Sequence, residues 1–195
     1  LAYTGGAGYT DLWIGDAQNQ HQCRDTQYEI RGPVVRQLQE GVLENWKEVS
    51  SKTLHGPDYF PPLPSAGRMV SHFSLGAPED RGDTLGSSFL LAINAAQQSI
   101  LIEHAYFIPH RDLVNALLRA RQRGVHVEII VCGEHTDFKV CRIAQRPSLL
   151  QLHRAGCQIW EYSPTMMHGK LLVVDDYFSA VGSANFDDRS FFLND

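Results

Sequence analysis

The chain has 195 residues, with 17 lysines and arginines against 22 aspartates and glutamates, a formal net charge of −5 and 43% hydrophobic residues. A charged fraction of 20% beside 10% aromatic residues excludes a disordered or low-complexity chain. Because bulk nucleic-acid binding normally needs an excess of lysine and arginine, the acidic balance disfavours a nucleic-acid partner. The length allows one sizeable core or two small ones.

The ends of the sequence and its cysteines indicate its context. No apolar run approaches the roughly 20 residues of a membrane-spanning helix, and no signal segment opens the chain. Because the sequence starts at Leu1 and stops on the apolar run 191–193, we expect a soluble piece of a longer protein. The cysteines lack C-x-x-C spacing, which favours buried reduced thiols over zinc ligands or disulfides. They are Cys23, Cys132, Cys141 and Cys157.

The first 83 residues hold one predicted helix and a long irregular segment. Residues 25–31 have strand character, and Gly32-Pro33 begins a helix with proline near its first turn. Apolar residues at helical spacing form one stripe of Val34, Val35, Leu38, Val42, Leu43 and Trp46. Proline and glycine then accumulate over 51–83, which indicates a connector or an active-site loop.

From residue 84 onwards, predicted helices and strands alternate. Asp83 and Asp112 can cap two helices, Gly124 can end the second, and 147–155 forms a third. The predicted strands are 99–103, 125–131, 158–161, 171–174 and 178–181. Strands separated by helices predict an α/β fold, with a mostly parallel mixed sheet flanked by helices on both faces. Sites in such sheets gather at the carboxyl ends of the strands.

The most informative stretch is a motif that reads His168-x-Lys170-x4-Asp175, with a Gly-Ser-x-Asn turn at 182–185. Because alternate residues of a strand share a face, His168 and Lys170 project to the same side, and Gly169 leaves room on the other. The turn can bring a hydroxyl and an amide to the same place. Each residue taken alone could have an ordinary structural role, but no common structural reason explains all of them at this fixed spacing.

These groups suit phosphoryl transfer. A neutral imidazole can attack phosphorus or, once protonated, protonate a departing alkoxide. Lys170, Ser183 and Asn185 would stabilise the charge that grows on the phosphoryl oxygens. The sequence lacks H-E-x-x-H, a Walker-type loop and a tight acidic or histidine cluster, so we expect neither a metal nor another cofactor.

The motif resembles the signature of the phospholipase D superfamily, the His-Lys-Asp phosphodiesterases, without a gap. Around it, Tyr-Phe-Ile-Pro at 106–109 and Asp-Asp-Arg-Ser-Phe at 187–191 are similar to the second half of bacterial cardiolipin synthases and related phosphatidyltransferases. Gly-Pro-Val-Val at 32–35 is similar to the close of the first half. The resemblance therefore implies three parts: 1–50 as the end of the N-terminal half, 51–83 as the connector or active-site loop, and 84–195 as the C-terminal catalytic half.

Family members of this kind carry two such motifs, one in each half, around a shared site. This chain contains one, and Gly-Gly-x-Gly at 5–8 resembles the turn that follows the first motif, with Gly8 where asparagine is common. The first histidine would be the nucleophile that forms a phosphohistidine, and His168 the general acid and base. By resemblance, Asp25 orients His168, although a strand-end turn explains it as well. The equivalent acid for the other histidine should fall at or beyond Asp195, and Asp175 should bind nearby backbone.

Three further residues are candidates for substrate contact. Glu103, His104 and Tyr106 end a predicted strand on the expected active face. A packed tyrosine and a hydrogen-bonded histidine are the alternative. In the loop, Phe60, Leu63 and Met69 could shape a lipid entrance or pack over a core edge.

The resemblance implies phosphatidyl transfer between phosphatidylglycerol molecules, with an anionic phospholipid as substrate. It also implies a missing first-motif half or a second copy as partner. The full-length protein would act at a membrane surface, the cytoplasmic side of the bacterial inner membrane. Two alternatives remain: a hydrolase or nuclease on the same scaffold, and a catalytically incomplete fragment with a structural role.

Overall fold

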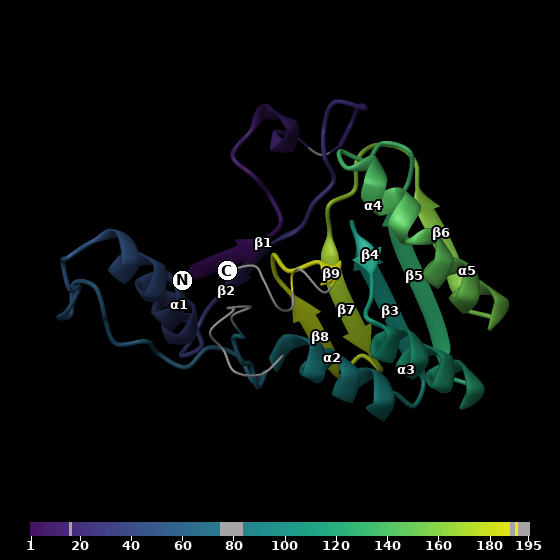
Figure 1. Ribbon diagram of the computed structural model, residues 1–195. Helices are drawn as coiled ribbons and strands as arrows, with labels where there is room; N and C mark the ends of the chain where they lie inside the picture. Colours follow the sequence, from purple (N-terminus) through teal and green to yellow (C-terminus); the bar gives the residue numbers. More distant parts are fainter. Residues whose placement is uncertain (16, 75–83, 188–189, 191–195) are drawn as a thin grey trace. The chain divides into compact units, whose positions relative to one another are not determined.

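The computed structural model describes residues 1–15, 17–74, 84–187 and 190 (Figure 1). The chain forms two compact units. The smaller comprises Leu1–Thr4 and Tyr28–Leu75, and the larger comprises Gly5–Gln27 and Gly76–Asp195. The predicted three-part division follows the expected halves of a longer protein and stays a prediction. The predicted cap at Asp83 lies outside the described residues.

The smaller unit contains a short sheet and one helix. Strands β1 (Ala2–Gly5) and β2 (Gln27–Ile30) pair, and α1 (Val35–Val49) follows the predicted Gly-Pro start. The predicted apolar stripe is only partly buried: Val35 is buried, Val34, Leu38 and Leu43 are half-buried, and Val42 and Trp46 are exposed. Residues 51–74 contain neither helix nor strand, as the density of proline and glycine predicts.

The larger unit is built on a five-stranded mixed sheet in the order β6-β5-β3-β7-β8 (Figure 1). Its strands are β3 (Ser99–His104), β5 (His126–Cys132), β6 (Gln158–Tyr162), β7 (Lys170–Val174) and β8 (Phe178–Val181). The predicted mostly parallel mixed sheet is confirmed, because β3, β5, β6 and β8 run in one direction and β7 runs opposite to them. β5 runs parallel to β3 and β6, whereas β7 runs antiparallel to β3 and β8. A tight turn joins β7 and β8, and such a connection allows only antiparallel pairing.

The core of this unit lies on one face of the sheet. Helices α2 (Thr84–Ala95), α3 (Arg111–Gln122) and α5 (Arg146–Arg154) bury their apolar sides there, where Ile93, Leu117 and Leu152 join Ile100 and Ile129. On the other face Leu101 is 37% and Trp160 is 53% exposed. Among the described residues, the helices of the core thus cover one face and not two. The three central strands, β5, β3 and β7, alternate between buried side chains and half-buried or exposed ones, the pattern of a sheet covered on one side.

Shorter elements complete the larger unit. They are the 3₁₀ helix η1 (Asp11–Trp13), the paired strands β4 (Phe107–Ile108) and β9 (Phe186–Asp187), and α4 (Lys139–Ala144). The predicted cap at Asp112 is wrong, because His110 precedes α3 and its ring accepts a hydrogen bond from the Asp112 N–H. Gly124, with φ of +89°, ends α3 as predicted.

Two further sequence expectations concern cysteines and membranes. All four cysteines are free thiols, and Cys23, Cys132 and Cys157 are buried. None of the helices in the described part of the chain has the length and apolar character needed to cross a membrane.

Candidate active site

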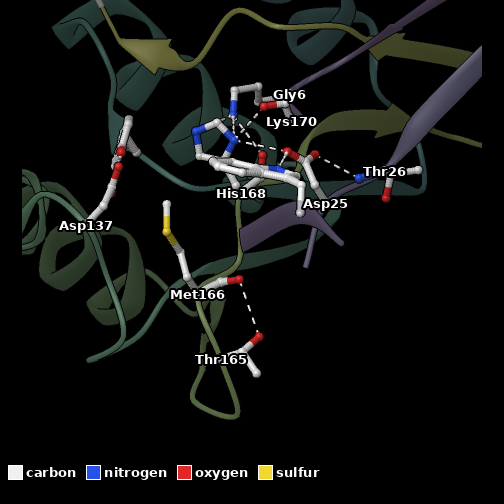
Figure 2. A network of polar contacts seen from close by, with 10 residues as sticks. Gly6, Asp25, Thr26, Asp137, Thr165, Met166, His168 and Lys170 are labelled. Carbon is white, nitrogen blue, oxygen red and sulfur yellow. Dashed lines mark hydrogen bonds and ion pairs between the residues drawn. The ribbon is translucent and has the colours of Figure 1, made fainter. Parts of the chain in front are cut away.

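The site is centred on His168, which lies just before β7 and next to Asp25. Nδ1 of His168 is 3.0 Å from Oδ2 of Asp25 and 3.0 Å from the carbonyl oxygen of Gly6 (Figure 2). The Asp25 side chain is 4% exposed and that of His168 17% exposed, so solvent screens the pair only weakly. The contact that the resemblance implies between these two residues is therefore present in the structure.

Backbone pairing brings these distant residues together. The N–H of Arg24 donates to the carbonyl of Met166 at 2.7 Å, and the N–H of His168 donates to the carbonyl of Arg24 at 2.7 Å. This short parallel bridge between Arg24 and Met167 fixes the register, so that Asp25 must lie beside His168. The approach also requires glycine at position 6, because a Cβ there would lie 2.8 Å from Oδ2 of Asp25 and 2.9 Å from Nζ of Lys170.

Three donors hold the carboxylate of Asp25. Besides His168, the indole Nε1–H of Trp13 donates to Oδ2 at 3.1 Å, and the N–H of Thr26 donates to Oδ1 at 2.8 Å. Burial tends to raise the pKa of Asp25, but the hydrogen bonds from His168, Trp13 and Thr26 outweigh it and lower the pKa below its ordinary value. Asp25 is thus an ionised, fixed acceptor for the imidazole.

The proton on the His168 ring follows from its neighbours. At Nδ1 the carboxylate of Asp25 and the carbonyl oxygen of Gly6 can only accept, so we assign the ring hydrogen to Nδ1 and leave Nε2 to face the Lys170 ammonium. Nε2 is then the basic nitrogen of the neutral ring and the acidic N–H of the imidazolium. An imidazole with its distal nitrogen on a carboxylate is arranged to exchange protons through the other nitrogen.

Lys170 is buried against the same ring. Its Nζ donates to the backbone carbonyl of His168 at 2.7 Å and lies 3.1 and 3.2 Å from the two ring nitrogens. Burial lowers the pKa of Lys170 to about 8, although the carboxylates of Asp25, Asp137 and Asp187 oppose the shift. A cation held at this position can neutralise an anionic phosphoryl group beside His168.

Two aromatic rings flank the imidazole. Trp13 meets it edge to face, with centroids 5.6 Å apart and an interplanar angle of 82°, and Tyr106 does so at 6.0 Å and 78°. The hydroxyl of Tyr106 donates to Oδ1 of Asp137. Figure 2 shows Asp25 and Asp137 on opposite sides of the imidazole. Sequence reasoning missed Trp13 and Asp137.

Asp175, the last motif residue, lies at the opposite end of β7. Its carboxylate accepts hydrogen bonds from the N–H groups of Gln97, Gln98 and Ser99 at 2.7 to 2.8 Å. These bonds, that of Ser99 first, lower the pKa of Asp175. The arrangement ties the turn after β7 to the start of β3, as expected for a structural group.

The residues of the Gly-Ser-x-Asn turn are less closely connected to His168 and Lys170. Ser183 is exposed and, among the described residues, makes no hydrogen bond to His168 or Lys170. The N–H of Asn185 donates to the hydroxyl of Ser190 at 3.0 Å. The buried Oδ1 of Asn185 has no hydrogen-bond partner in the described part of the chain. The amide of Asn185 therefore keeps free hydrogen-bonding capacity, whereas nothing in the structure ties the Ser183 hydroxyl to the site.

Of the three candidates for substrate contact, Tyr106 lies against the imidazole, whereas Glu103 lies on the opposite face of the strand. A Cβ at Gly169 would collide with Oε1 of Glu103, so Glu103 fills the room that Gly169 leaves on the far side of the strand. Burial raises the pKa of Glu103, and Arg24 opposes this shift. His104 pairs in register with Lys170 and is 1% exposed, and neither of its ring nitrogens has a hydrogen-bond partner among the described residues. Burial and the charge of Lys170 lower the pKa of His104 to about 3.

The described side chains of the site are not arranged as ligands of a metal ion. Among the described residues, no three histidine, cysteine, aspartate or glutamate side chains are grouped as ligands of one ion. Asp195, near which the second orienting acid was expected, lies outside the described residues.

The geometry of a motif histidine, a buried lysine and an orienting aspartate agrees with comparisons to known proteins. The family model described as "Cardiolipin synthase, PLD-like domain" matches residues 89–195, more than half of the chain. The chain belongs to this family, and so to the phospholipase D superfamily that the motif indicates.

This chain is also similar in sequence to named relatives and in structure to solved proteins. The chain is 33% identical to a cardiolipin synthase of Geobacillus sp. (strain WCH70) and 34% identical to cardiolipin synthase A of Pseudomonas putida. Both alignments include 100% of this chain but only 39% and 40% of the relatives. Phosphatidylserine synthase of Haemophilus influenzae superimposes with a TM-score of 0.49 at 18% identity, covering 93% of this chain and 44% of that one. Nuc of Salmonella typhimurium, a phospholipase D family member, does so with 0.46 at 25%, covering 55% and 68%.

Proposed function

We propose that the chain supplies the second His-Lys-Asp motif of an enzyme that transfers a phosphatidyl group between two phosphatidylglycerol molecules, forming cardiolipin and releasing glycerol. The observation that carries this proposal is the contact between His168 Nδ1 and the buried carboxylate of Asp25, with Lys170 against the same ring. Family membership and cardiolipin synthase relatives support the choice of substrate.

The chemistry divides into two proton transfers at Nε2 of His168. In the first step, a histidine of the other motif attacks phosphorus, the bond to the glycerol oxygen breaks, and the Nε2–H of the imidazolium protonates the leaving alkoxide. In the second step, the neutral Nε2 takes the proton of an incoming hydroxyl as that oxygen attacks the phosphohistidine. The charge of Asp25 stabilises the imidazolium in both directions.

Lys170 would serve the phosphoryl group itself. Its buried ammonium lies on the ring that exchanges protons, so it is positioned to pair with equatorial phosphoryl oxygens when charge grows on them. We assign Asn185 to the same oxygens through its Nδ2–H groups, because its unpartnered Oδ1 only accepts hydrogen bonds. Ser183 is left with a weaker claim, because it is exposed and unconnected to these groups among the described residues.

The site needs a second histidine, since one imidazole cannot be nucleophile and acid on opposite sides of one phosphorus. We propose that the first-motif half of the complete protein or a second copy of this chain provides it. Because its substrate is a membrane lipid, we propose that the complete protein acts at the cytoplasmic face of the bacterial inner membrane.

The test measures phosphatidylglycerol conversion by the full-length protein carrying His168→Ala. We expect cardiolipin formation to fall by about 10²- to 10⁴-fold, the contribution of a placed acid or base. The matched control is His153→Ala, which removes an exposed histidine of α5 and should leave the rate unchanged.

Normal turnover by His168→Ala would exclude the proposal. A wild-type protein that cleaves DNA but not phosphatidylglycerol would instead favour a nuclease of the same superfamily. A full-length protein inactive on both would favour a purely structural role for this domain.

A further inference from the structure

A second carboxylate borders the site on the side away from Asp25. Asp137 follows β5 in the loop that leads to α4, and it accepts the hydrogen bond of the Tyr106 hydroxyl through Oδ1. The Tyr106 ring in turn meets His168 edge to face, with centroids 6.0 Å apart. Asp137 is thus joined to the imidazole through one side chain, and Figure 2 places it across the ring from Asp25.

Asp137 remains open to a ligand. The residue is exposed, and among the described residues its second oxygen, Oδ2, forms no hydrogen bond. Its charge reaches Lys170, where it opposes the effect of burial. Asp137 is therefore both accessible and close enough to influence the groups that handle the phosphoryl transfer.

The chemistry of a carboxylate narrows what it could bind. An ionised carboxylate only accepts hydrogen bonds and repels an anionic phosphoryl group, so its partner must be a hydrogen-bond donor. The donor that this reaction brings to the site is an alcohol. A glycerol headgroup has two adjacent hydroxyls, so one can donate to Asp137 while the other approaches Nε2 of His168.

We infer that Asp137 is a specificity-determining residue that binds a hydroxyl of the incoming glycerol headgroup and so favours transfer to phosphatidylglycerol over transfer to water. This inference rests on the proposed function. A water molecule has a single oxygen, so it cannot bind Asp137 through one hydroxyl while a second hydroxyl attacks. Tyr106 acts as a positioning residue, since its hydroxyl fixes the carboxylate beside the imidazole.

The test measures two products of one reaction. The full-length protein carrying Asp137→Ala is given phosphatidylglycerol vesicles, and cardiolipin and phosphatidic acid are quantified together. We expect their ratio to fall about tenfold, because one hydrogen bond to a charged acceptor is lost. The ratio does not depend on how much of the variant is folded. Tyr106→Phe should shift the ratio in the same direction by a smaller factor.

Glu134→Gln is the matched control. It removes an exposed carboxylate from the same loop, one that makes no hydrogen bond to Tyr106 in the described residues, and the ratio should equal that of the wild type. An unchanged ratio in Asp137→Ala overturns the inference even if both rates fall together. A wild-type protein that forms neither product overturns the proposed function, and this inference with it.

Discussion

The two ends of strand β7 carry residues of one motif but differ in what they contact. At its start, His168 and Lys170 meet side chains and backbone of the distant segment 5–27. At its end, the hydrogen bonds that Asp175 accepts from described residues come from backbone N–H groups at the start of the adjacent strand. The motif spans the whole strand, because Lys170 begins β7 and Asp175 directly follows its last residue, so a single strand joins a reactive end to an anchored end.

This difference teaches that a sequence motif is not a list of equivalent catalytic groups. At the reactive end, charges are buried and shifted, as the lowered pKa values of Lys170 and Asp25 show. At the anchored end, a carboxylate fills the hydrogen-bonding needs of three N–H groups, which stabilises the fold. Substitutions at the two ends should therefore change different quantities.

The largest effect is expected at the reactive end. Asp25→Asn removes the charge that stabilises the imidazolium, so cardiolipin formation should fall about 10²-fold. The free energy of unfolding should fall by only about 1 kcal/mol, because Thr26 and Trp13 donate to different oxygens and the amide keeps one of the two acceptors. Asp11→Asn makes the same change in the same segment, at an exposed residue, and is the control. Equal rates for the two variants would show that Asp25 does not orient His168.

The pH dependence of the rate probes Lys170. Burial favours the neutral amine and lowers the pKa from 10.5 to about 8, so the charged form dominates below pH 8 and is lost above it. The rate should therefore fall about tenfold per pH unit above pH 8, because the loss of one proton from Lys170 inactivates the enzyme. In Lys170→Arg the fall should move to higher pH, since a guanidinium keeps its charge. A flat wild-type profile from pH 7 to 10 would contradict a catalytic cation at this position.

A smaller effect is expected at the anchored end. In Asp175→Asn the new side chain still tolerates the backbone φ of +52° at this position, because asparagine adopts positive φ as aspartate does. The substitution replaces one acceptor oxygen by a donor. The free energy of unfolding, from urea titration of the full-length protein, should fall by about 1 kcal/mol. The rate per folded molecule should stay within about twofold of the wild type.

Asp176→Asn provides the control for that change. Asp176 lies in the same turn with φ of +56° and is exposed, so its substitution should leave both quantities unaltered. A loss of rate in Asp175→Asn with stability unchanged would reverse the assignment of the two ends.

Much of this unit could be predicted because local signals determine it. The five predicted strands of the sheet appear within one or two residues of their expected bounds, since apolar alternation reports burial directly. The prediction that helices cover both faces of the sheet is wrong. Helical crossovers between strands suggested two covered faces, but the apolar alternation of 125–131 indicates one buried face. The direction of β7 depends on a turn, which composition alone does not show.

The site was predictable where the motif is contiguous and not where long loops close. His168 and Lys170 follow from spacing, and the place of Asp25 came from resemblance. Trp13 lies in a segment without helix or strand periodicity, so nothing local connects it to Asp25. Asp137 carried a usable signal, because it follows the carboxyl end of a parallel strand, where sites gather.

The most direct test of the account uses a substrate whose leaving group needs no proton. Full-length His168→Gln is mixed with phosphatidyl-p-nitrophenol and, separately, with phosphatidylglycerol. We expect a rapid release of p-nitrophenol equal to the amount of enzyme, followed by arrest, because the second step lacks its base. We expect no comparable release of glycerol. Continued wild-type turnover of phosphatidylglycerol, or loss of the p-nitrophenol burst in a folded variant, would contradict His168 as the acid and base of the reaction.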